Sequence, residues 1–572
     1  MNFKWNYCPP SAEVRGRAQQ LSESTGIHPV LTELLIKRGM ESPEDVKNFF
    51  RPSLRSLHDP FLMCDMKTAV ERLNTAMRNK ERIMIYGDYD VDGVTSVALV
   101  YNFLSKFYSE LEYYIPDRYN EGYGISKMGV DHAIEHGVGL IIVLDCGIKA
   151  VEAISYAAEH GVDFIICDHH VPGEIMPPAA AILNPKRPDS TYPCSDLSGC
   201  GVGFKFMQAF AISNSIEFKY LSPLLDLCAV SIAADIVPVI DENRILAYHG
   251  LKVLNSNPSV GLQAIIDICG LQNRDLTMGD IVFKIGPRIN ASGRIQNGTE
   301  AVDLLVEKDF SQAYKKASLI NEYNETRKDL DKSVTEEAVE KIDSYDLEGH
   351  SSIVIYNETW HKGVIGIVAS RLTEKYYRPS VVLTRGEKLA TGSARSIEGF
   401  DVYKAIENCR DLLENFGGHT YAAGLSLKVE NIPAFKRKFE EYVSQHINDS
   451  QTMPQIDIDA IIDFKDITRK FNRDLQHFSP FGPLNEKPIF STRKVFDYGT
   501  SKVVGRRQEH IKLELVDNKS NNIMNGIAFG QSSQARYIKT RQSFDICYTI
   551  ENNIYKKGEV QLQIEDIKPS EK

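Results

Sequence analysis

The sequence predicts an α/β protein in which a parallel-sheet lobe and a smaller α/β lobe are joined by a long helix and followed by a C-terminal β-barrel. Three observations support this class. A length of 572 residues suits roughly three to four domains. Short Val/Ile-rich runs alternate with helical segments between Arg82 and Leu183, as in parallel sheets covered by helices on both faces. After Ile456, β-branched and aromatic residues alternate between turn signals, which is typical of a small barrel or sandwich.

The elements follow in order along the chain. Residues 1–60 are expected to form a helical lead-in, and residues 61–300 the first lobe. Residues 301–345 combine apolar positions three and four apart with almost no Gly or Pro, which predicts a connecting helix. A second alternation of strands and helices predicts the smaller lobe over residues 346–450, and the barrel is expected over residues 451–572.

Composition excludes several classes of protein. Apolar residues make up 42% of the chain and charged residues 25%, which is the balance of an ordinary globular protein. The longest apolar stretches, such as Val138–Leu144, are far shorter than the roughly 18–20 residues that span a bilayer. The first residues show no secretory signal, and the ten scattered cysteines form no CxxC pair. We therefore expect a cytoplasmic protein with reduced thiols.

Charge is distributed unevenly. The formal net charge is −11, but the segment from Phe464 to the end holds 19 Lys and Arg against 13 Asp and Glu. An acidic total does not exclude a nucleic-acid partner, because phosphates respond to the local field. The basic C-terminal region therefore favours a polyanionic partner.

The strongest chemical signal is the motif GDYDVDG, which directly follows the first predicted strand of the sheet. Asp88, Asp90 and Asp92 alternate along it, so two or three carboxylates can converge at the carboxyl end of that strand. Ionised carboxylates that lie together repel one another unless cations neutralise them. A calcium loop of the EF-hand type also begins D-x-D-x-D-G, but the glutamate expected at its twelfth position is missing here and a strand precedes the motif.

Two further predicted strands end in acidic or imidazole groups. Asp145 follows one strand, and Asp168, His169 and His170 follow the next. The carboxyl ends of parallel strands share one edge of the sheet, where ligands bind. Asp235, at a later helix-to-loop junction, is a further candidate. A mixed Asp/His set without cysteine suits Mn²⁺, with Mg²⁺ as the alternative, and two such ions support hydrolysis of a phosphoester or phosphoanhydride.

These motifs resemble those of the DHH phosphoesterases. The matching segments are DYDVDG (88–93), DCG (145–147), DHH (168–170) and ADIVP (234–238), with GGH (417–419) similar to the companion DHHA1 domain. Longer segments are similar to the bacterial single-strand-specific DNA exonucleases of this family, namely residues 116–124, 286–294, 361–366 and 392–396. The resemblance extends over nearly the whole chain and implies an OB-fold-like C-terminal barrel.

The resemblance also implies roles for individual residues. It implies metal ligation by Asp90, Asp92, Asp145, His169 and Asp235. It implies catalytic roles for three more residues. His170 would face the phosphate, Asp168 would orient its neighbours, and Asp88 would be a secondary ligand.

Substrate binding requires donors for phosphate oxygens and flat faces for bases. Arg118 and Tyr123 supply one of each, and Arg288, Asn290 and Arg294 are expected in a Gly-rich loop that can approach a nucleic-acid backbone closely. The second lobe offers a set of hydroxyl, guanidinium, backbone and imidazole donors. Its members are Ser393, Arg395, Ser396, Gly418 and His419.

The barrel combines basic and aromatic residues, which suits a groove in which bases stack on rings. The basic residues are Arg506, Arg507, Lys512, Arg536 and Lys539, and the aromatic ones are Phe496, Tyr498, Phe529, Tyr537 and Tyr555. Most of these aromatic rings are expected to fill the barrel.

The function expected from these features is a single-stranded-DNA-specific 5′→3′ exonuclease that hydrolyses phosphodiester bonds by a two-metal-ion mechanism in DNA recombination and repair. The 5′→3′ direction and the role in repair follow from the resemblance alone. So do single-strand-binding protein and a repair helicase as partners. A monomer is expected.

Two alternatives differ in substrate or in class. DHH-family pyrophosphatases, oligoribonucleases and cyclic-dinucleotide phosphodiesterases share the metal chemistry but lack a basic barrel. A catalytically silent DNA-binding or scaffold protein would have lost metal ligands, whereas all five proposed ligands are present. A salt titration distinguishes the exonuclease from the first alternative. Binding of a long single strand through many phosphates weakens steeply with salt, whereas binding of a dinucleotide depends on salt only weakly.

Overall fold

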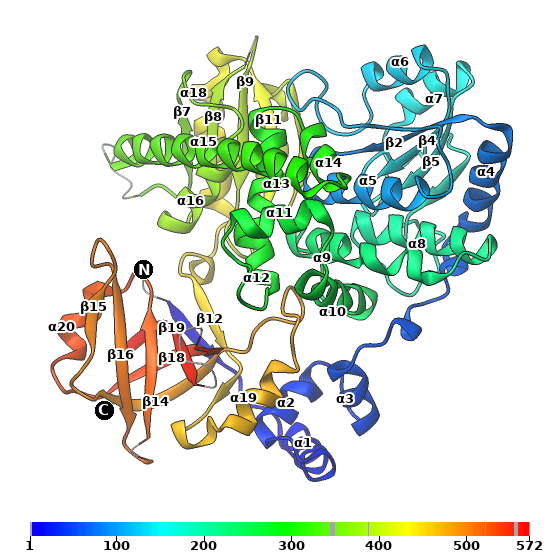
Figure 1. Ribbon diagram of the computed structural model, residues 1–572. Helices are drawn as coiled ribbons and strands as arrows, with labels where there is room; N and C mark the ends of the chain where they lie inside the picture. Colours follow the sequence, from blue (N-terminus) through cyan, green and yellow to red (C-terminus); the bar gives the residue numbers. More distant parts are fainter. Residues whose placement is uncertain (1–2, 344–348, 387, 521, 554–558, 571–572) are drawn as a thin grey trace. The chain divides into compact units, whose positions relative to one another are not determined.

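The computed structural model describes residues 3–343, 349–386, 388–520, 522–553 and 559–570 (Figure 1). The chain forms two compact units. One unit is a continuous stretch, Leu54–Met453, which holds both lobes. The other unit joins the two end segments of the chain, Met1–Ser53 and Pro454–Lys572.

The first lobe is built on a five-stranded parallel sheet in the order β3-β2-β4-β5-β6. The strands are β2 (Arg82–Gly87), β3 (Leu111–Tyr114), β4 (Val138–Leu144), β5 (Asp163–Cys167) and β6 (Ala181–Leu183). Along β4, Leu140, Ile142 and Leu144 join one core. Ile141 and Val143 join the core on the opposite face. Both faces are buried, which explains the continuous hydrophobic run and confirms the predicted parallel sheet.

Helices cover the two faces of this sheet (Figure 1). One core includes residues of α4 (Met66–Asn79), α5 (Val91–Leu104) and α8 (Gly199–Ser213). The other includes residues of α6 (Lys127–Glu135) and α7 (Val151–Glu159). The chain passes from β2 to β3 on one side and then to β4 on the other, and in open parallel sheets ligands bind at the carboxyl ends of the strands where the order reverses in this way.

A helical region follows the sheet. Its helices are α9 (Leu225–Ala234), α10 (Asp241–Ser256), α11 (Val260–Ile268), α12 (Met278–Asp280), α13 (Gly286–Ile295) and α14 (Thr299–Leu305), with a π-helical turn over Ile281–Ile285. The long helix α15 spans Phe310–Asp343 and is drawn in green in Figure 1. It belongs to the unit Leu54–Met453. Its Ala317 and Ile320 pack in the core of the first lobe, and its Val334 and Ala338 pack with residues of the second lobe.

Residues 286–294 form helix α13 and not the Gly-rich loop expected from the sequence. Pro287 lies in the first turn of the helix, where a missing backbone N–H costs nothing. A Cβ atom at Gly293 would lie 2.8 Å from the carbonyl oxygen of Tyr89. The glycine therefore allows the helix to pack closely against the acidic motif.

The second lobe has a mixed sheet in the order β10-β11-β9-β8-β7. The strands are β7 (Ile353–Tyr356), β8 (Ser380–Arg385), β9 (Ala390–Arg395), β10 (Asn415–His419) and β11 (Ala422–Leu427). The helices are α16 (Ile365–Tyr376), α17 (Val402–Asn408) and α18 (Ile432–His446). Val381 and Leu383 pack with α17 and α18, whereas Val382 packs with α16. The helices therefore cover both faces of this sheet as well.

Five strands close the C-terminal barrel, because β14 pairs with both β18 and β16. These strands are β14 (Phe490–Asp497), β16 (His510–Asp517), β17 (Ile523–Ala528), β18 (Phe544–Asn552) and β19 (Val560–Pro569), extended by β13 (Ala460–Ile461) and β15 (Lys502–Val504). Phe490, Phe544 and Tyr548 are fully buried inside it. The predicted barrel is confirmed.

The first 53 residues pack with the barrel and share its core. The strand β1 (Lys4–Tyr7) pairs in parallel with β12 (Gln455–Ile458). The helices α1 (Ala12–Thr25), α2 (Pro29–Lys37) and α3 (Pro43–Phe50) follow. Leu31 and Leu35 are buried in the same core as Phe471 of α19 (Arg469–Gln476). The helices were expected, but the partner of their apolar faces could not be read from local sequence.

The ten cysteines carry free thiols, and seven of them are buried. Within the described ranges, no helix combines the length and the apolar character needed to cross a membrane.

Candidate metal centre and phosphate site

The acidic motif forms the turn between β2 and α5. Asp90 caps the N-terminus of α5, and its carboxylate accepts a hydrogen bond from the Gly93 N–H at 3.1 Å. A Cβ atom at Gly93 would lie 2.2 Å from the carbonyl oxygen of Asp88, so the turn requires glycine. A strand leads into this turn, whereas an EF-hand loop joins two helices. The calcium-loop alternative is therefore wrong.

Three carboxyl groups from separate elements meet around the imidazole of His169. Its Nε2 atom lies 3.1 Å from Asp145 Oδ1, 3.7 Å from Asp235 Oδ2 and 3.8 Å from Asp92 Oδ2. Asp145 follows β4, His169 follows β5, Asp92 lies in the first turn of α5, and Asp235 is the residue at the C-terminal end of α9. Four of the five expected ligands thus converge at the sheet edge.

Burial and mutual repulsion raise the pKa values of three carboxyl groups at this edge, those of Asp88, Asp145 and Asp235. Burial, with Asp90 beside it, raises the pKa of Asp88 well above its usual range. Burial, then Asp92 and Asp90, raise the pKa of Asp145 in the same way. The same causes raise the pKa of Asp235 to about 9. Asp90, the fifth expected ligand, therefore lies in the same electrostatic field.

The carboxylate of Asp92 is held by donors that sequence reasoning missed. It accepts hydrogen bonds from the backbone N–H groups of Gly199 and Cys200, at 2.7 and 2.9 Å, and from the Ser231 hydroxyl at 2.7 Å. Gly199 begins α8, and helix N-termini favour anions. Ser198 as N-cap before a Gly-Cys-Gly helix start was the available signal.

The unpaired polar atoms of the site fit a divalent cation. The structure gives no hydrogen-bond partner to either ring nitrogen of buried His169 or to Oδ1 of buried Asp88, among the residues that it describes. Leaving such atoms unsatisfied is costly. The donor atoms are carboxylate oxygens and imidazole nitrogens, which suit Mn²⁺ and Mg²⁺ better than a thiolate-seeking metal. The five expected ligands would hold the ions.

His170 is oriented by its neighbours at the edge of this centre. Its Nδ1 lies 2.8 Å from Asp168 Oδ1, which also accepts the backbone N–H groups of His169 and His170. Although burial opposes it, hydrogen bonding to His170 lowers the pKa of Asp168 to about 2. The hydroxyl of the exposed Tyr123 lies 3.3 Å from His170 Nε2. Asp168 thus positions the ring of His170.

Four arginines gather beside the acidic motif, and we call them the arginine cluster: Arg118, Arg294, Arg327 and Arg395. Burial, followed by the three other arginines, lowers the pKa of Arg294 to about 10. Burial and Arg118 lower the pKa of Arg395. Arg118 lies over the ring of Tyr89, 5.0 Å from its centre. Like charges held together in partly buried positions favour an anionic ligand.

Arg327 was missed by sequence reasoning. It lies on α15, where a lysine- and glutamate-rich sequence suggests only a solvated surface.

The second lobe reaches the same site. Arg395 Nη1 donates to Ser393 Oγ at 2.9 Å. Burial and then His170 lower the pKa of His419, which places this imidazole in the field of the first lobe's histidine. Gly418 has a φ of +150°, and a Cβ atom there would lie 2.4 Å from the carbonyl oxygen of Ala422. Only glycine fits that position in β10, next to His419.

Other expected substrate residues have intramolecular partners. Arg288 donates to Asn321 Oδ1 at 2.9 Å and to the Lys284 carbonyl at 2.7 Å. The Ser396 hydroxyl donates to the Phe400 carbonyl at 2.7 Å. Asn290 is half-buried on α13. Arg288 and Ser396 therefore already have hydrogen-bond partners within the chain, and they are not among the arginines that surround Arg294.

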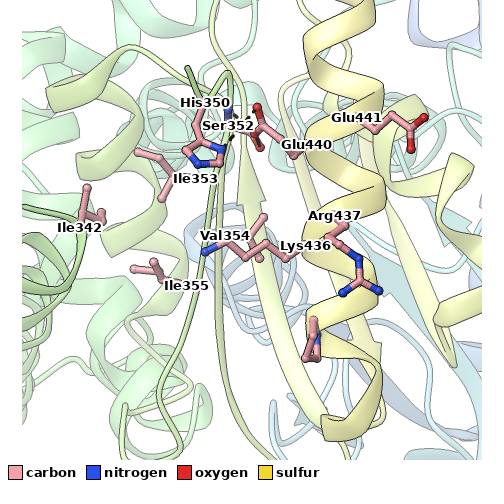
Figure 2. Close-up of a pocket in the computed structure, with 11 residues that line it drawn as sticks. Ile342, His350, Ser352, Ile353, Val354, Ile355, Lys436, Arg437, Glu440 and Glu441 are labelled. Carbon is pink, nitrogen blue, oxygen red and sulfur yellow. Dashed lines mark hydrogen bonds and ion pairs between the residues drawn. The ribbon is translucent and has the colours of Figure 1, made fainter. Parts of the chain in front are cut away.

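A pocket of about 670 Å³ lies elsewhere in the second lobe, between β7, the end of α15 and α18 (Figure 2). Its polar edge is formed by Glu440, which accepts hydrogen bonds from the backbone N–H and the hydroxyl of Ser352. None of the described residues that line it belongs to the expected site.

Comparison with family models matches all three folded regions. The DHH family N-terminal domain matches residues 82–232, the DHHA1 domain residues 349–445 and the RecJ OB domain residues 458–566. The fold and the acidic centre thus define a phosphoesterase of the DHH class, a family of metal-dependent hydrolases.

Comparison with individual proteins narrows the class. The single-stranded-DNA-specific exonuclease RecJ of Dickeya dadantii is 31% identical over 560 residues, which cover 94% of this chain and 96% of the relative. RecJ of Bacillus subtilis is 36% identical over 91% of this chain, which spans only 65% of that longer relative. The chain belongs to the RecJ family of exonucleases.

Solved structures agree with this assignment. A crystal structure of exonuclease RecJ bound to manganese is 30% identical, with a TM-score of 0.59 over 68% of this chain and 96% of that one. RecJ of Thermus thermophilus in complex with Mn²⁺ has a TM-score of 0.84 at 24% identity, over 100% of this chain and 80% of that chain, and shows the same fold. The family expected from the sequence is confirmed, and both of these solved relatives hold Mn²⁺, the ion that the sequence favours for this site.

Proposed function

We propose that this chain degrades single-stranded DNA from the 5′ end by hydrolysing phosphodiester bonds at a centre for two divalent ions, Mn²⁺ or Mg²⁺. The observation that carries the proposal is the convergence of Asp92, Asp145 and Asp235 on His169 beside the arginine cluster. Cation ligands next to anion donors are what a phosphodiester substrate requires.

Each group has a proposed role. Asp90, Asp92, Asp145, His169 and Asp235 hold the ions, which supply charge stabilisation for the attacking and leaving oxygens. Asp88 supports the ligands from the turn between β2 and α5.

The phosphate would be bound from both lobes. His170, held by Asp168, donates from Nε2 to a phosphate oxygen. Arg118, Arg294 and Arg395 neutralise the phosphates that flank the scissile bond. His419 and the Ser393 hydroxyl add donors from the second lobe.

The barrel would also bind single-stranded DNA. Phe529 and Tyr498 are the exposed rings among the expected aromatics, whereas Tyr537 packs on Phe544. Phe529 lines a pocket of about 620 Å³ together with His510 and Lys512. Such a set stacks bases and neutralises phosphates without sequence preference. Tyr555 lies outside the described residues.

Digestion of labelled single strands tests the activity and its direction. With Mn²⁺, wild-type protein should release 5′ label first as mononucleotides, and a chelator should stop the reaction. Asp145→Asn should lower kcat on the order of 10³-fold, because it removes a charged ligand from the centre. Asp131→Asn, which changes a half-buried carboxyl on α6 that is paired with Lys127, is the matched control. Full activity of Asp145→Asn, or release of 3′ label first, would contradict the proposal.

Wider assignments rest on the family resemblance. We propose that the protein is a monomer and that it acts in the cytoplasm, in DNA recombination and repair. Its proposed partners are single-strand-binding protein and a repair helicase.

A further inference from the structure

A second set of metal-ligand side chains lies in the first lobe, and we call it the His/Glu cluster: Glu112, His132 and His136. Glu112 is on the edge strand β3, and the two histidines lie at the C-terminal end of α6. His136 Nδ1 lies 3.4 Å from Glu112 Oε2, and His132 Nε2 lies 3.8 Å from Glu112 Oε1. One ligand atom from each residue lies within 4.8 Å of the other two.

The ligand atoms of the His/Glu cluster are close enough to one another to bind the same metal ion. Residues four apart project from the same face of a helix, and the rings of His132 and His136 have centroids 3.8 Å apart. Bonds of about 2.0–2.1 Å in a tetrahedral site place ligand atoms roughly 3.3–3.4 Å from one another. The observed separations from Glu112 therefore need only small rotations of the side chains.

The carboxylate in the cluster lacks a donor. Glu112 Oε1 is buried and has no hydrogen-bond partner in the part of the chain that the structure describes. A buried carboxylate oxygen without a partner is costly. His132 and His136 are 37% and 45% exposed, so an ion and a water ligand can reach the cluster from solvent.

We propose that Glu112, His132 and His136 bind one Zn²⁺ ion that is separate from the catalytic ions. Two imidazoles and one carboxylate form a set that zinc uses with a fourth position open to water. Glu112 pairs with Met84, four residues before Asp88 on β2, so roughly 13 Å of strand separates the two sites. They cannot share a ligand.

Zinc at this position has a structural role. β3 ends at Tyr114 and α6 begins at Lys127, so the ligands lie on both sides of the loop that carries Arg118 and Tyr123. In the described sheet, β3 is an edge strand with β2 as its neighbour. The ion ties this edge strand to α6 and stabilises the first lobe where the sheet has no further strand.

Zinc content measured on the whole chain tests the proposal. Zn²⁺ binds nitrogen and oxygen ligands more tightly than Mn²⁺, so each protein is equilibrated with Zn²⁺ alone and its total zinc content is measured after gel filtration. Wild type should retain one zinc more than His136→Asn, whose cluster should bind zinc at least about 100-fold more weakly. Asparagine is well tolerated at a helix C-terminus. His160→Asn, at the corresponding end of α7, is the matched control and should retain the zinc.

A further variant makes the outcome decisive. Glu112→Gln keeps the size of the side chain and should also retain one zinc less than wild type. Zn²⁺ should raise the unfolding temperature of wild type and His160→Asn by more than that of His136→Asn or Glu112→Gln, each shift being measured from the same protein in chelator. Wild-type zinc content in both cluster variants overturns the proposal, and the nuclease assay above is independent of this result.

Discussion

The metal centre and the arginine cluster lie next to each other in the unit Leu54–Met453 and carry opposite charges. In the metal centre, burial and neighbouring carboxylates raise the pKa values of Asp88, Asp145 and Asp235. In the arginine cluster, burial and neighbouring arginines lower the pKa values of Arg294 and Arg395. In the free protein, like charges within each region repel one another and destabilise it. A bound ligand of opposite charge would remove this repulsion. The difference in charge is the basis on which we propose that cations bind in the first region and phosphates in the second.

The two regions are also held in different ways. Asp92 is fixed by the N-terminus of α8 and by Ser231, within the core of one lobe. The arginines come from a loop, from α13, from α15 and from β9 of the other lobe. Rigid placement suits ions that require defined ligand geometry, whereas a set drawn from several elements can follow a longer substrate.

The largest effect on activity is expected from a substitution in the metal centre. His169→Ala should lower kcat on the order of 10³-fold, because it removes the imidazole on which three carboxylates converge. Isothermal titration with Mn²⁺ should show weaker binding, while the circular dichroism spectrum stays unchanged. His160→Ala removes an exposed histidine and should match wild type. Unchanged Mn²⁺ binding in His169→Ala would show that this imidazole is not a ligand.

A smaller effect is expected in the arginine cluster. Arg395→Gln should lower kcat/KM by about 10- to 100-fold, since a hydrogen bond to a charged group contributes about 1.5–3 kcal/mol. Mn²⁺ affinity should not fall. Arg385→Gln, which changes an exposed arginine at the end of β8, is the matched control. A loss of Mn²⁺ binding in Arg395→Gln would contradict the proposal that the arginine cluster binds phosphates and does not contribute to metal binding.

The pH dependence of stability sharpens the comparison. In metal-free protein, the pKa of Asp235 is about 9 when folded and about 3.9 when unfolded. Between these values the folded state holds a proton that the unfolded state has lost. Its contribution to the free energy of unfolding is therefore complete below about pH 4 and falls as pH rises towards 9, by at most about 1.4 kcal/mol per pH unit.

Urea unfolding at pH 6 and pH 8 in chelator measures this slope. Asp235→Asn should reduce it, and Mn²⁺ should stabilise wild type more at pH 8 than at pH 6. An equal slope in wild type and Asp235→Asn would contradict the assignment of the raised pKa to this group.

The smallest effect concerns the barrel. Lys512→Ala should lower the slope of log K against log salt for single-strand binding by about 1, because one phosphate contact is lost. Fluorescence anisotropy with a labelled strand measures it. Lys519→Ala, an exposed lysine paired with Asp463, should leave the slope unchanged. An identical slope in both variants would remove Lys512 from the strand-binding surface.

Sequence reasoning predicted which acidic and imidazole side chains lie together, because most of them follow strands of one parallel sheet. Strand direction alone places Asp90, Asp145 and His169 at the same edge. The donors to Asp92 escaped prediction because backbone N–H groups carry no sequence signature of their own. Gly286–Arg294 was expected as a loop because glycine serves both flexibility and close packing, and only the nearby backbone of Tyr89 shows which applies.

The sequence by itself determined the order of the elements, the class of the two lobes and the side chains able to bind metal and phosphate. These properties depend on local periodicity and on residue chemistry. Only the tertiary structure decided that the first 53 residues pack with the barrel, that Arg327 of α15 joins the arginine cluster and that Arg288 is paired with Asn321. Such contacts join residues far apart in the chain, and local patterns carry no information about which distant surface an exposed or apolar face will meet.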